Sequence, residues 1–253
     1  MNIDVITLLP EIFDALKWGV TSKALLNQSI TLNTWNPRHY TSNTHNTVDD
    51  RPYGGGPGMV MLYEPLAKTI IDIHSKREQT HTVYLTPQGK PLTQTDVVRL
   101  SKLPQLTLLC GRYEGIDQRL IDDYVDEEIS LGDFILSGGE IPAMSMIDAV
   151  ARLMPEVLGC SHSAEQDSFS NGLLEGPCYT RPEVVNGRTV PSVLTSGNHR
   201  AISDWRRKES VRITWQRRPD LIKRHILSPD EWDELHKLTE DRAAQQNKGN
   251  DNE

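Results

Sequence analysis

Glycine-rich strings are the parts of this sequence that could most directly build a ligand site. The string RPYGGGPGM, at residues 51–59, carries four glycines in five residues. Glycine adopts backbone conformations that other residues avoid, and it lets a ligand approach the backbone closely. A flexible surface turn is the simpler interpretation. No GxxxxGKS/T string follows, and no GxGxxG string follows the first predicted strand, which disfavours Walker-type nucleotide hydrolysis and a conventional dinucleotide fold.

Three further loops follow predicted strands. They are TPQG at residues 86–89, CGRYEG at residues 110–115 and SLGDFILSGGE at residues 130–140. In open α/β sheets, ligands bind just beyond the carboxyl ends of the strands. Each loop alone could be a tight turn in a compact sheet. The three together favour one pocket built from backbone amides.

Other side chains that could do chemistry are less specific on their own. Arg152 and Asp167 flank a polar segment, and a lone Asp in such a segment is commonly a cap or a solvated charge. The string YTRP at residues 179–182 is turn-like. The eight His are scattered without a metal-ligand spacing, so we predict no metal site. No GxSxG nucleophile elbow is present.

The first half of the chain alternates strand and helix signals, which would position these loops. The predicted strands are residues 3–9, 82–85, 106–110 and 127–130. The predicted helices are residues 11–26, 62–73, 92–100, 116–121 and 143–154, and Pro142 begins the last of them. Continuous apolar strands separated by helices indicate a parallel sheet covered on both faces. We therefore predict an α/β fold.

The second region differs in composition. Residues 159–175 are polar and aperiodic and read as a flexible linker. Helical spacing resumes at residues 198–215, and residues 228–231 (SPDE) are typical of a helix start. The polar residues from 243 onward are expected to be frayed. We predict a domain over residues 1–158, the linker at 159–175 and a small helical domain over residues 176–253.

Charge is distributed unevenly along the chain. The net charge is −8, yet residues 200–224 hold nine Lys and Arg against three acids, +6, which leaves −14 for the rest. A basic patch on an acidic protein can steer a polyanion to one face, but a helix face with internal salt bridges explains it as well. The three Cys are far apart, and neither a membrane span nor a secretory signal is visible. We expect a cytoplasmic protein with reduced thiols.

Five strings, taken in order, carry a resemblance to a known family. They are VDDRPYGGGPGM at 48–59, YLTPQG at 84–89, CGRYEGID at 110–117, GDFILSGGE at 132–140 and YTRPEV at 179–184. They resemble the bacterial tRNA (guanine-N1)-methyltransferase family, and the similarity extends from residue 9 to residue 219. Gly176 and Cys178 depart from the cysteine and histidine that are common in the family at these positions.

The resemblance implies a knotted methyltransferase of the SPOUT class. Such an enzyme has a trefoil knot in its sheet, a rare exception to unknotted topology. It uses S-adenosyl-methionine and works as a homodimer with its active site between the subunits. Its substrate is tRNA, at the guanosine just 3′ of the anticodon (guanosine-37), where methylation maintains the reading frame.

The resemblance also assigns residues. The cofactor-binding set is Tyr84, Leu85, Gly111, Tyr113, Glu114, Gly115, Leu131, Gly132, Asp133, Phe134, Ile135, Leu136, Gly138, Gly139 and Pro142. Asp167 is the expected general base and Arg152 its electrostatic partner. The residues expected to contact RNA are Asp49, Gly58, Arg206, Arg207, Arg212, Arg217 and Arg218.

The chemistry suits those residue types. Guanine N1 carries a proton at neutral pH, and a carboxylate that accepts it provides general-base catalysis worth ~10²–10⁴-fold. Arg152 would stabilise the negative charge that grows on guanine O6. Two alternatives stay open, namely an RNA-binding protein without catalysis and a knotted methyltransferase acting on another RNA or on a ribose 2′-hydroxyl.

Overall fold

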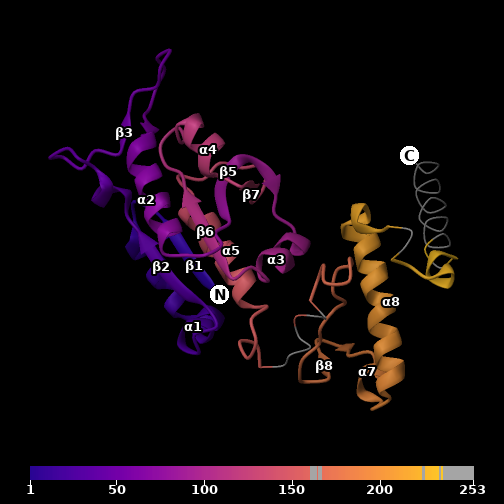
Figure 1. The fold of residues 1–253 in the computed structure, drawn as a ribbon. Coiled ribbons are helices and arrows are strands. Elements are labelled where there is room, and N and C mark those ends of the chain that lie inside the picture. The colour runs from indigo at the N-terminus through magenta and orange to yellow at the C-terminus, as the bar shows by residue number, and fades with distance from the viewer. Residues whose placement is uncertain (160–163, 165–166, 224–225, 234, 236–253) are drawn as a thin grey trace, which may run out of the picture. The chain divides into compact units, whose positions relative to one another are not determined.

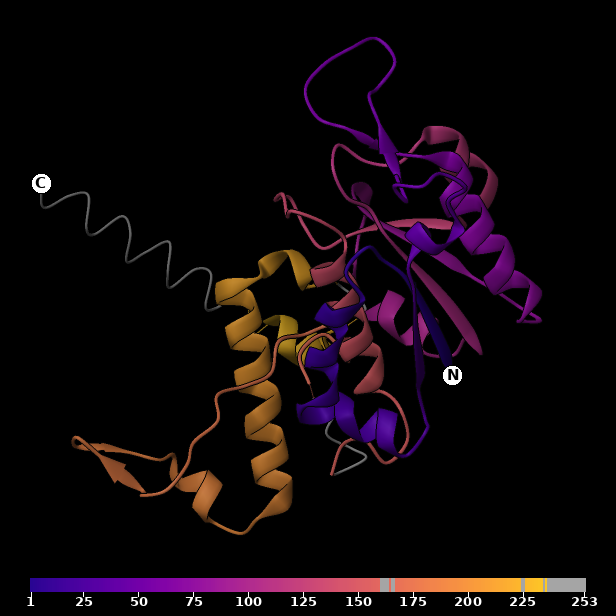
Figure 2. The ribbon, with the colours of Figure 1, turned by 90° about the vertical axis from the view of Figure 1, so that its left-hand side faces the viewer.

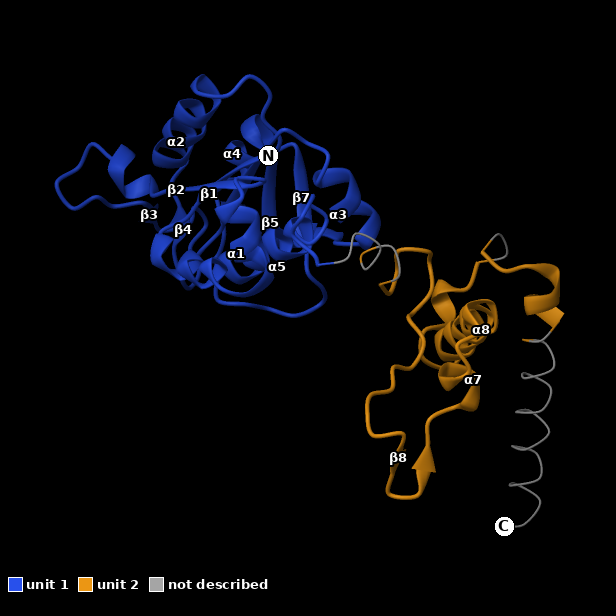
Figure 3. Cartoon of the chain, turned by 90° about the horizontal axis from the view of Figure 1, so that it is seen from below, with its two compact units in different colours: residues 1–161 blue, residues 162–253 orange. Residues whose placement is uncertain are grey.

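The computed structural model describes residues 1–159, 164, 167–223, 226–233 and 235. The chain forms two compact units, residues 1–161 and residues 162–253 (Figure 3). The boundary between them falls inside the predicted linker, part of which lies outside the described residues, as does the tail that we expected to be frayed. The exact domain limits therefore stay a prediction.

The first unit is built on a five-stranded parallel sheet in the order β2-β1-β6-β5-β7 (Figure 1). Residues of β6 are buried without exception, as are four of the five in β1, because both faces of the sheet are covered. This arrangement confirms the predicted parallel α/β sheet. The strands are β1 (Asn2–Ile6), β2 (Thr31–Trp35), β5 (Thr82–Pro91), β6 (Gln105–Cys110) and β7 (Glu127–Ser130).

Helices cover the two faces of this sheet with separate apolar clusters. Leu66 and Ile70 of α2 pack with Ile6 and Leu109 on one face. The helices η1, α1, α3 and α5 pack against the other face, where the cluster includes Val5. The helices of this unit are η1 (Pro10–Lys17), α1 (Gly19–Leu26), η2 (Pro37–Tyr40), α2 (Tyr63–Ser75), α3 (Gln94–Leu100), α4 (Gln118–Tyr124) and α5 (Glu140–Ala151).

Several sequence predictions in this unit were wrong in detail. The strand expected at 3–9 ends at Ile6, and the helix that Pro142 was expected to begin starts at Glu140. The single helix expected at 11–26 is two helices, because Trp18 is extended and Gly19 has a left-handed φ of 70° between them. The loop expected at 86–89 does not end a strand. It is an irregularity within β5, whose pairing with β7 shifts register after Leu85 and resumes at Lys90.

A short hairpin accounts for the first glycine-rich string. Strand β3 (Asp49–Asp50) pairs antiparallel with β4 (Val60–Met61), and residues 51–59 connect the two. The glycine string is therefore the tip of a hairpin and does not follow a strand of the main sheet.

The second unit is organised around one long helix. Val211 and Trp215 of α8 pack with Leu173 and Leu227, and the β8–β9 hairpin stands clear of α8 in Figure 2. The helix predicted at 198–215 is confirmed as α8. The elements are β8 (Val184–Val185), β9 (Arg188–Thr189), α7 (Ser192–Thr195), α8 (His199–Arg217) and η3 (Pro219–Leu221).

Capping groups begin the helical segments of this unit as expected. Asn198 Oδ1 accepts a hydrogen bond from Ala201 N at 3.2 Å. At the predicted start near residue 228, Glu231 N donates to Ser228 Oγ at 3.2 Å and Ser228 N donates to Glu231 Oε2 at 2.7 Å. This reciprocal pair is a capping box, which satisfies backbone donors of the first turn. Within the residues described, the structure holds no helix of the length and apolarity needed to span a membrane.

A buried carboxylate holds one end of the sheet together. Asp4 on β1 is fully buried and accepts hydrogen bonds from Asn33 Nδ2 at 3.0 Å, Trp35 Nε1 at 2.8 Å and Gln105 Nε2 at 2.5 Å. Arg77, just beyond α2, adds an ion pair through Nε at 3.1 Å. These contacts tie β2, β6 and α2 to the same strand, since each supplies a donor to one carboxylate.

We predict that Asp4→Ala lowers the free energy of unfolding by about 3–5 kcal/mol, because it leaves the Arg77 guanidinium and three amide or indole donors without their acceptor. Urea denaturation would measure the change. Asp14→Ala is the matched control, since Asp14 forms an exposed ion pair with Lys17 and should leave stability nearly unchanged. Equal effects of the two substitutions would contradict the prediction.

Candidate functional site

The loops that follow β6 and β7 meet at the carboxyl edge of the sheet. Gly139 N donates a hydrogen bond to Gly111 O at 2.9 Å. A Cβ on Gly139 would lie 2.7 Å from Cys110 Cα, so a larger residue would push the two loops apart. The structure thus joins two of the glycine loops that the sequence placed at one pocket.

Tyr84 and Leu85 of β5 are both buried, and the Tyr84 ring lies beneath this junction. Tyr84 is 6% exposed, and burial is the main cause of the raised pKa of its phenol. A Cβ on Gly111 would come within 2.9 Å of the Tyr84 ring. Tyr84 therefore lies under Gly111, whereas Leu85 packs in the apolar cluster on the other face of the sheet.

The loops themselves present apolar side chains and unusual backbone conformations. Tyr113 is 48% exposed and Phe134 is 55% exposed, which is unusual for aromatic residues. Gly115 and Gly132 have φ values of 132° and 150°, which favour glycine. Such a surface suits a ligand with a planar ring and several polar atoms. The other predicted residues of this loop and of the first turn of α5 are Leu131, Asp133, Ile135, Leu136, Gly138 and Pro142.

The hairpin of β3 and β4 joins the same loop. Met61 N donates to Gly115 O at 2.9 Å, and Glu114 N donates to Met59 O at 2.9 Å. A Cβ on Gly58 would overlap the side chain of Glu114. Asp49 stands opposite Met61 across the hairpin. The structure therefore brings Asp49 and Gly58 to the loop that holds residues 111–115, although about fifty residues separate them in sequence.

Sequence reasoning missed the polar residues that brace these loops. Glu140 is 1% exposed and pairs with Arg112, with 2.9 Å between Oε2 and Nη2. Thr7 Oγ1 donates to Glu140 Oε1 at 2.9 Å. Arg112 and Glu140 lie inside two of the quoted strings, whereas Thr7 had no signal beyond its place after β1. The nearby Cys110 thiol has a raised pKa because it is buried and faces the Glu140 charge, so it is an inert core thiol.

The two candidate catalytic residues belong to different units. Arg152 is the cap residue at the carboxyl end of α5, and its N–H donates to Asp148 O at 3.1 Å. Asp167 belongs to the second unit, where it lines a cavity of about 1220 Å³. Ser170 N donates to Asp167 O at 3.2 Å and closes a turn at this point.

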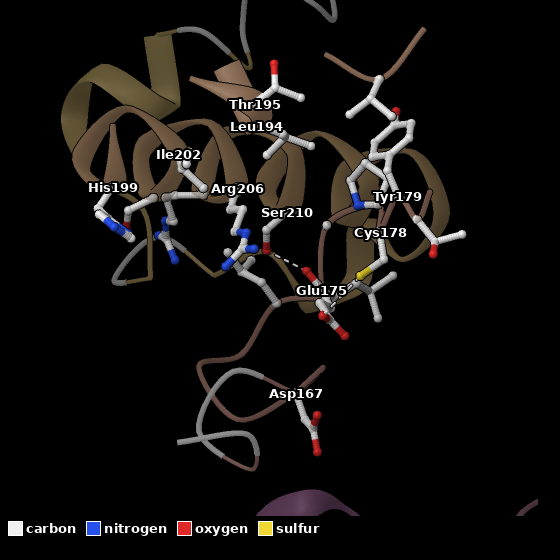
Figure 4. A pocket seen from close by; sticks show the side chains of 18 of the residues that line it. Asp167, Glu175, Cys178, Tyr179, Leu194, Thr195, His199, Ile202, Arg206 and Ser210 are labelled. Carbon is white, nitrogen blue, oxygen red and sulfur yellow. Dashed lines mark hydrogen bonds between the residues drawn. The ribbon is translucent and has the colours of Figure 1, made fainter. Parts of the chain in front are cut away.

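That cavity lies between α8 and the segment that leads up to β8 (Figure 4). Its walls include Arg206 of α8 and Tyr179, whose ring centroid lies 6.3 Å from that of Trp205. Cys178 Sγ donates to Glu175 Oε1 at 3.6 Å, and the Glu175 charge is the main cause of the raised pKa of the thiol. The cavity thus combines an aromatic surface with cationic and anionic groups.

The basic segment divides into paired and exposed arginines. Arg207 Nε lies 2.6 Å from Glu231 Oε1, and its Nη2 also donates to Ile226 O at 2.8 Å. Arg212 and Arg218 pair with nearby acids, Glu209 and Asp220. Arg206 and Arg217 are exposed on α8. Three of the five arginines expected to contact RNA are thus engaged in ion pairs with acids of the same unit, and RNA contact by all five stays a prediction.

Among the described residues, no group of three or more His, Cys, Asp or Glu side chains is placed to hold a metal ion.

These features define an α/β protein with a candidate ligand site at the carboxyl edge of a parallel sheet and a second unit with a basic helix. The profile of the tRNA (guanine-1)-methyltransferase family TrmD matches residues 1–224. The chain is 59% identical over 230 residues to the tRNA (guanine-N(1)-)-methyltransferase of Coxiella burnetii strain RSA 493, covering 90% of this chain and 94% of the relative. It is 58% identical over 225 residues to that of Ralstonia nicotianae, covering 88% and 86%. The chain belongs to the tRNA (guanine-1)-methyltransferase family.

We predict that Arg207→Ala lowers the free energy of unfolding by about 1–2 kcal/mol, a value discounted for the partial exposure of the ion pair. The Arg207 guanidinium is the main reason that the pKa of Glu231 lies below its ordinary value. Because the pKa of Glu231 is lower in the folded state, its ionised carboxylate stabilises the fold at any pH above its unfolded pKa of ~4.3. This stabilisation is lost as the pH falls through the pKa that Glu231 has in the folded state.

Chemical denaturation of wild type and variant from pH 7 down to pH 3 tests this. The difference in the free energy of unfolding between wild type and Arg207→Ala should shrink below about pH 4. Arg206→Ala serves as the control, and it should change stability little at any pH. A difference for Arg207→Ala that does not depend on pH would rule out the ion pair as its source.

Proposed function

We propose that this protein transfers a methyl group from S-adenosyl-methionine to N1 of the guanosine just 3′ of the anticodon, guanosine-37, in tRNA. The observation that carries the proposal is membership of the tRNA (guanine-1)-methyltransferase family over residues 1–224. Methylation at this position maintains the reading frame. We infer from the same membership that the protein works in the cytoplasm.

We assign the methyl donor to the two loops of residues 111–115 and 131–139, which meet at the carboxyl edge of the sheet. The fit rests on the close backbone contact between Gly139 and Gly111 and on the exposed rings of Tyr113 and Phe134, which suit a nucleoside with a planar base. When bound, the donor supplies a sulfonium-activated methyl group. We further propose that the loops belong to the trefoil knot of a SPOUT-class enzyme.

The remaining steps belong to this chain's own side chains. Asp167 acts as the general base that accepts the proton of guanine N1, since a carboxylate is an acceptor at neutral pH. Arg152 offsets the negative charge that develops on guanine O6. From family membership we propose that Arg152 and Asp167 meet in a homodimer whose active sites each draw on both subunits. The helical second unit would then hold the tRNA.

We predict that the purified protein, given S-adenosyl-methionine and a tRNA transcript with guanosine at positions 36 and 37, produces 1-methylguanosine at position 37. Asp167→Asn should slow single-turnover methylation by ~10²-fold or more, because the amide cannot accept the N1 proton. Donor affinity should stay near the wild-type value. Mass spectrometry of digested nucleosides and calorimetry with the donor provide the two measurements.

Other results would favour the alternatives. A 2′-O-methylated nucleoside would indicate a ribose methyltransferase, and tRNA binding without any methylated product would indicate a non-catalytic protein. A wild-type rate for Asp167→Asn would remove Asp167 as the base, whatever the product.

We predict that replacing Arg206 and Arg217 together with Gln flattens the salt dependence of tRNA binding. Each phosphate contact contributes ~0.7–0.9 to the slope of log K against log salt, so two lost contacts should reduce the slope by roughly 1.4–1.8. Filter binding across a salt series measures the slope. The paired arginines supply the control, and Arg212→Gln with Arg218→Gln should change the slope less. The reverse order would contradict this assignment.

A further inference from the structure

The buried Glu140 carboxylate sits beside the proposed donor loops, yet it plays no part in the proton transfer described above. Its Oε1 accepts hydrogen bonds from Thr7 Oγ1 at 2.9 Å and from Arg112 Nε at 3.1 Å. Its Oε2 lies 2.9 Å from Arg112 Nη2. Placing a charge at 1% exposure costs several kcal/mol before pairing. We call Thr7, Arg112 and Glu140 the Glu140 cluster.

The Glu140 cluster joins segments that are far apart in sequence. Thr7 follows β1, Arg112 follows β6, and Glu140 is the first residue of α5. The negative charge lies at the amino end of a twelve-residue helix, where the helix dipole favours it. Three strand-to-helix connections therefore converge on one carboxylate.

The same arginine reaches the backbone of the proposed donor loop. Arg112 Nη1 donates to Ser137 O at 3.3 Å, two residues before the Gly139–Gly111 contact. A Cβ on Gly138 would lie 2.5 Å from Arg112 Nε, so glycine is needed for the guanidinium to pass. The Arg112 side chain thus links the buried Glu140 carboxylate to the carbonyl of Ser137, which lies in the irregular loop between β7 and α5.

We propose that Glu140 is a positioning residue for the methyl donor. Through Arg112 it holds the loop of residues 131–139 against Gly111 in the shape that binds the donor, and it does so without touching the donor. This inference rests on the proposed function for the identity of the ligand. That Glu140 holds the loop through Arg112 is inferred only from the contacts of Arg112 with Glu140 and Ser137. The competing explanation is that the ion pair stabilises the fold and has no effect on the loop.

Glu140→Gln tests the inference, because the amide keeps the shape of the side chain and removes the charge that orients Arg112. We expect hydrogen exchange of the 131–139 amides to become faster in the free protein. Donor affinity, measured by calorimetry with S-adenosyl-methionine, should weaken roughly tenfold. The KM for the donor should rise with it, whereas kcat at saturating donor and tRNA affinity should stay within about twofold.

A matched control separates positioning from stability. Glu127 has a side chain 13% exposed and pairs with Arg99 at 2.7 Å, but it begins β7 at the opposite end from the loops. Glu127→Gln should lower stability and leave donor affinity unchanged. If both variants weaken donor binding equally, or if Glu140→Gln binds the donor like wild type, the inference is overturned.

Arg112→Lys provides a second route if Glu140→Gln does not fold. Lysine retains the positive charge, but its N–H groups all lie on one nitrogen, so it cannot contact both Glu140 oxygens and Ser137 O as the three nitrogens of Arg112 do. Loop exchange should therefore rise and donor affinity fall. Unchanged exchange and affinity would overturn the proposal. If wild type itself binds no S-adenosyl-methionine, the proposed function fails, while the exchange rates still decide whether the Glu140 cluster holds the loop.

Discussion

The backbone contact between Gly139 and Gly111 is the constraint on which the rest of the site depends. It requires glycine at its centre, because a Cβ on Gly139 would collide with the backbone of β6. It also determines where α5 begins, since Glu140 follows at once. Helix α5 then runs twelve residues to Arg152, a rise of about 18 Å. One short contact thus sets the position of the proposed donor loops and, through a single helix, of the proposed charge at guanine O6.

Much of this arrangement could be predicted from the sequence. Buried parallel strands read as continuous apolar runs, so β6 and β7 were predicted to within a residue of their limits, whereas β1 was expected to run to residue 9 and ends at Ile6. Strand β2 was missed because TLNTW is an edge strand with only partial burial. The split between η1 and α1 was also missed, since a single left-handed glycine does not interrupt helical apolar spacing.

The loops of the candidate site could also be predicted from the sequence, whereas the side chains that brace them could not. The glycine loops could be placed at one edge because parallel strands end on the same side. Thr7 could not be found, since nothing in a lone threonine after a strand signals a partner 133 residues away. The arginines of α8 illustrate a different limit. Charge clustering identifies a basic segment, but it cannot distinguish Arg207, which pairs with Glu231, from the exposed Arg206.

Ion pairs within the second unit affect which of its arginines we expect to contact tRNA. Three arginines form ion pairs with Glu231, Glu209 and Asp220, and these pairs stabilise the unit. Because each paired acid offsets the charge of its arginine, we expect these arginines to attract a polyanion less than unpaired arginines would. Under the proposed function, the exposed cations and the aromatic ring of Tyr179 in the α8 cavity are the groups expected to contact RNA. We therefore expect stability and RNA recognition to be divided between neighbouring residues of α8 and its carboxyl end.

A crystal structure of the protein with S-adenosyl-homocysteine, the demethylated donor, tests the central claim most directly. We expect the nucleoside to lie against the loops of residues 111–115 and 131–139, with backbone amides of both loops contacting it and the hydrogen bond between Gly139 N and Gly111 O retained. Density for the ligand in the α8 cavity instead, or a bound state in which the two loops have separated, would contradict it.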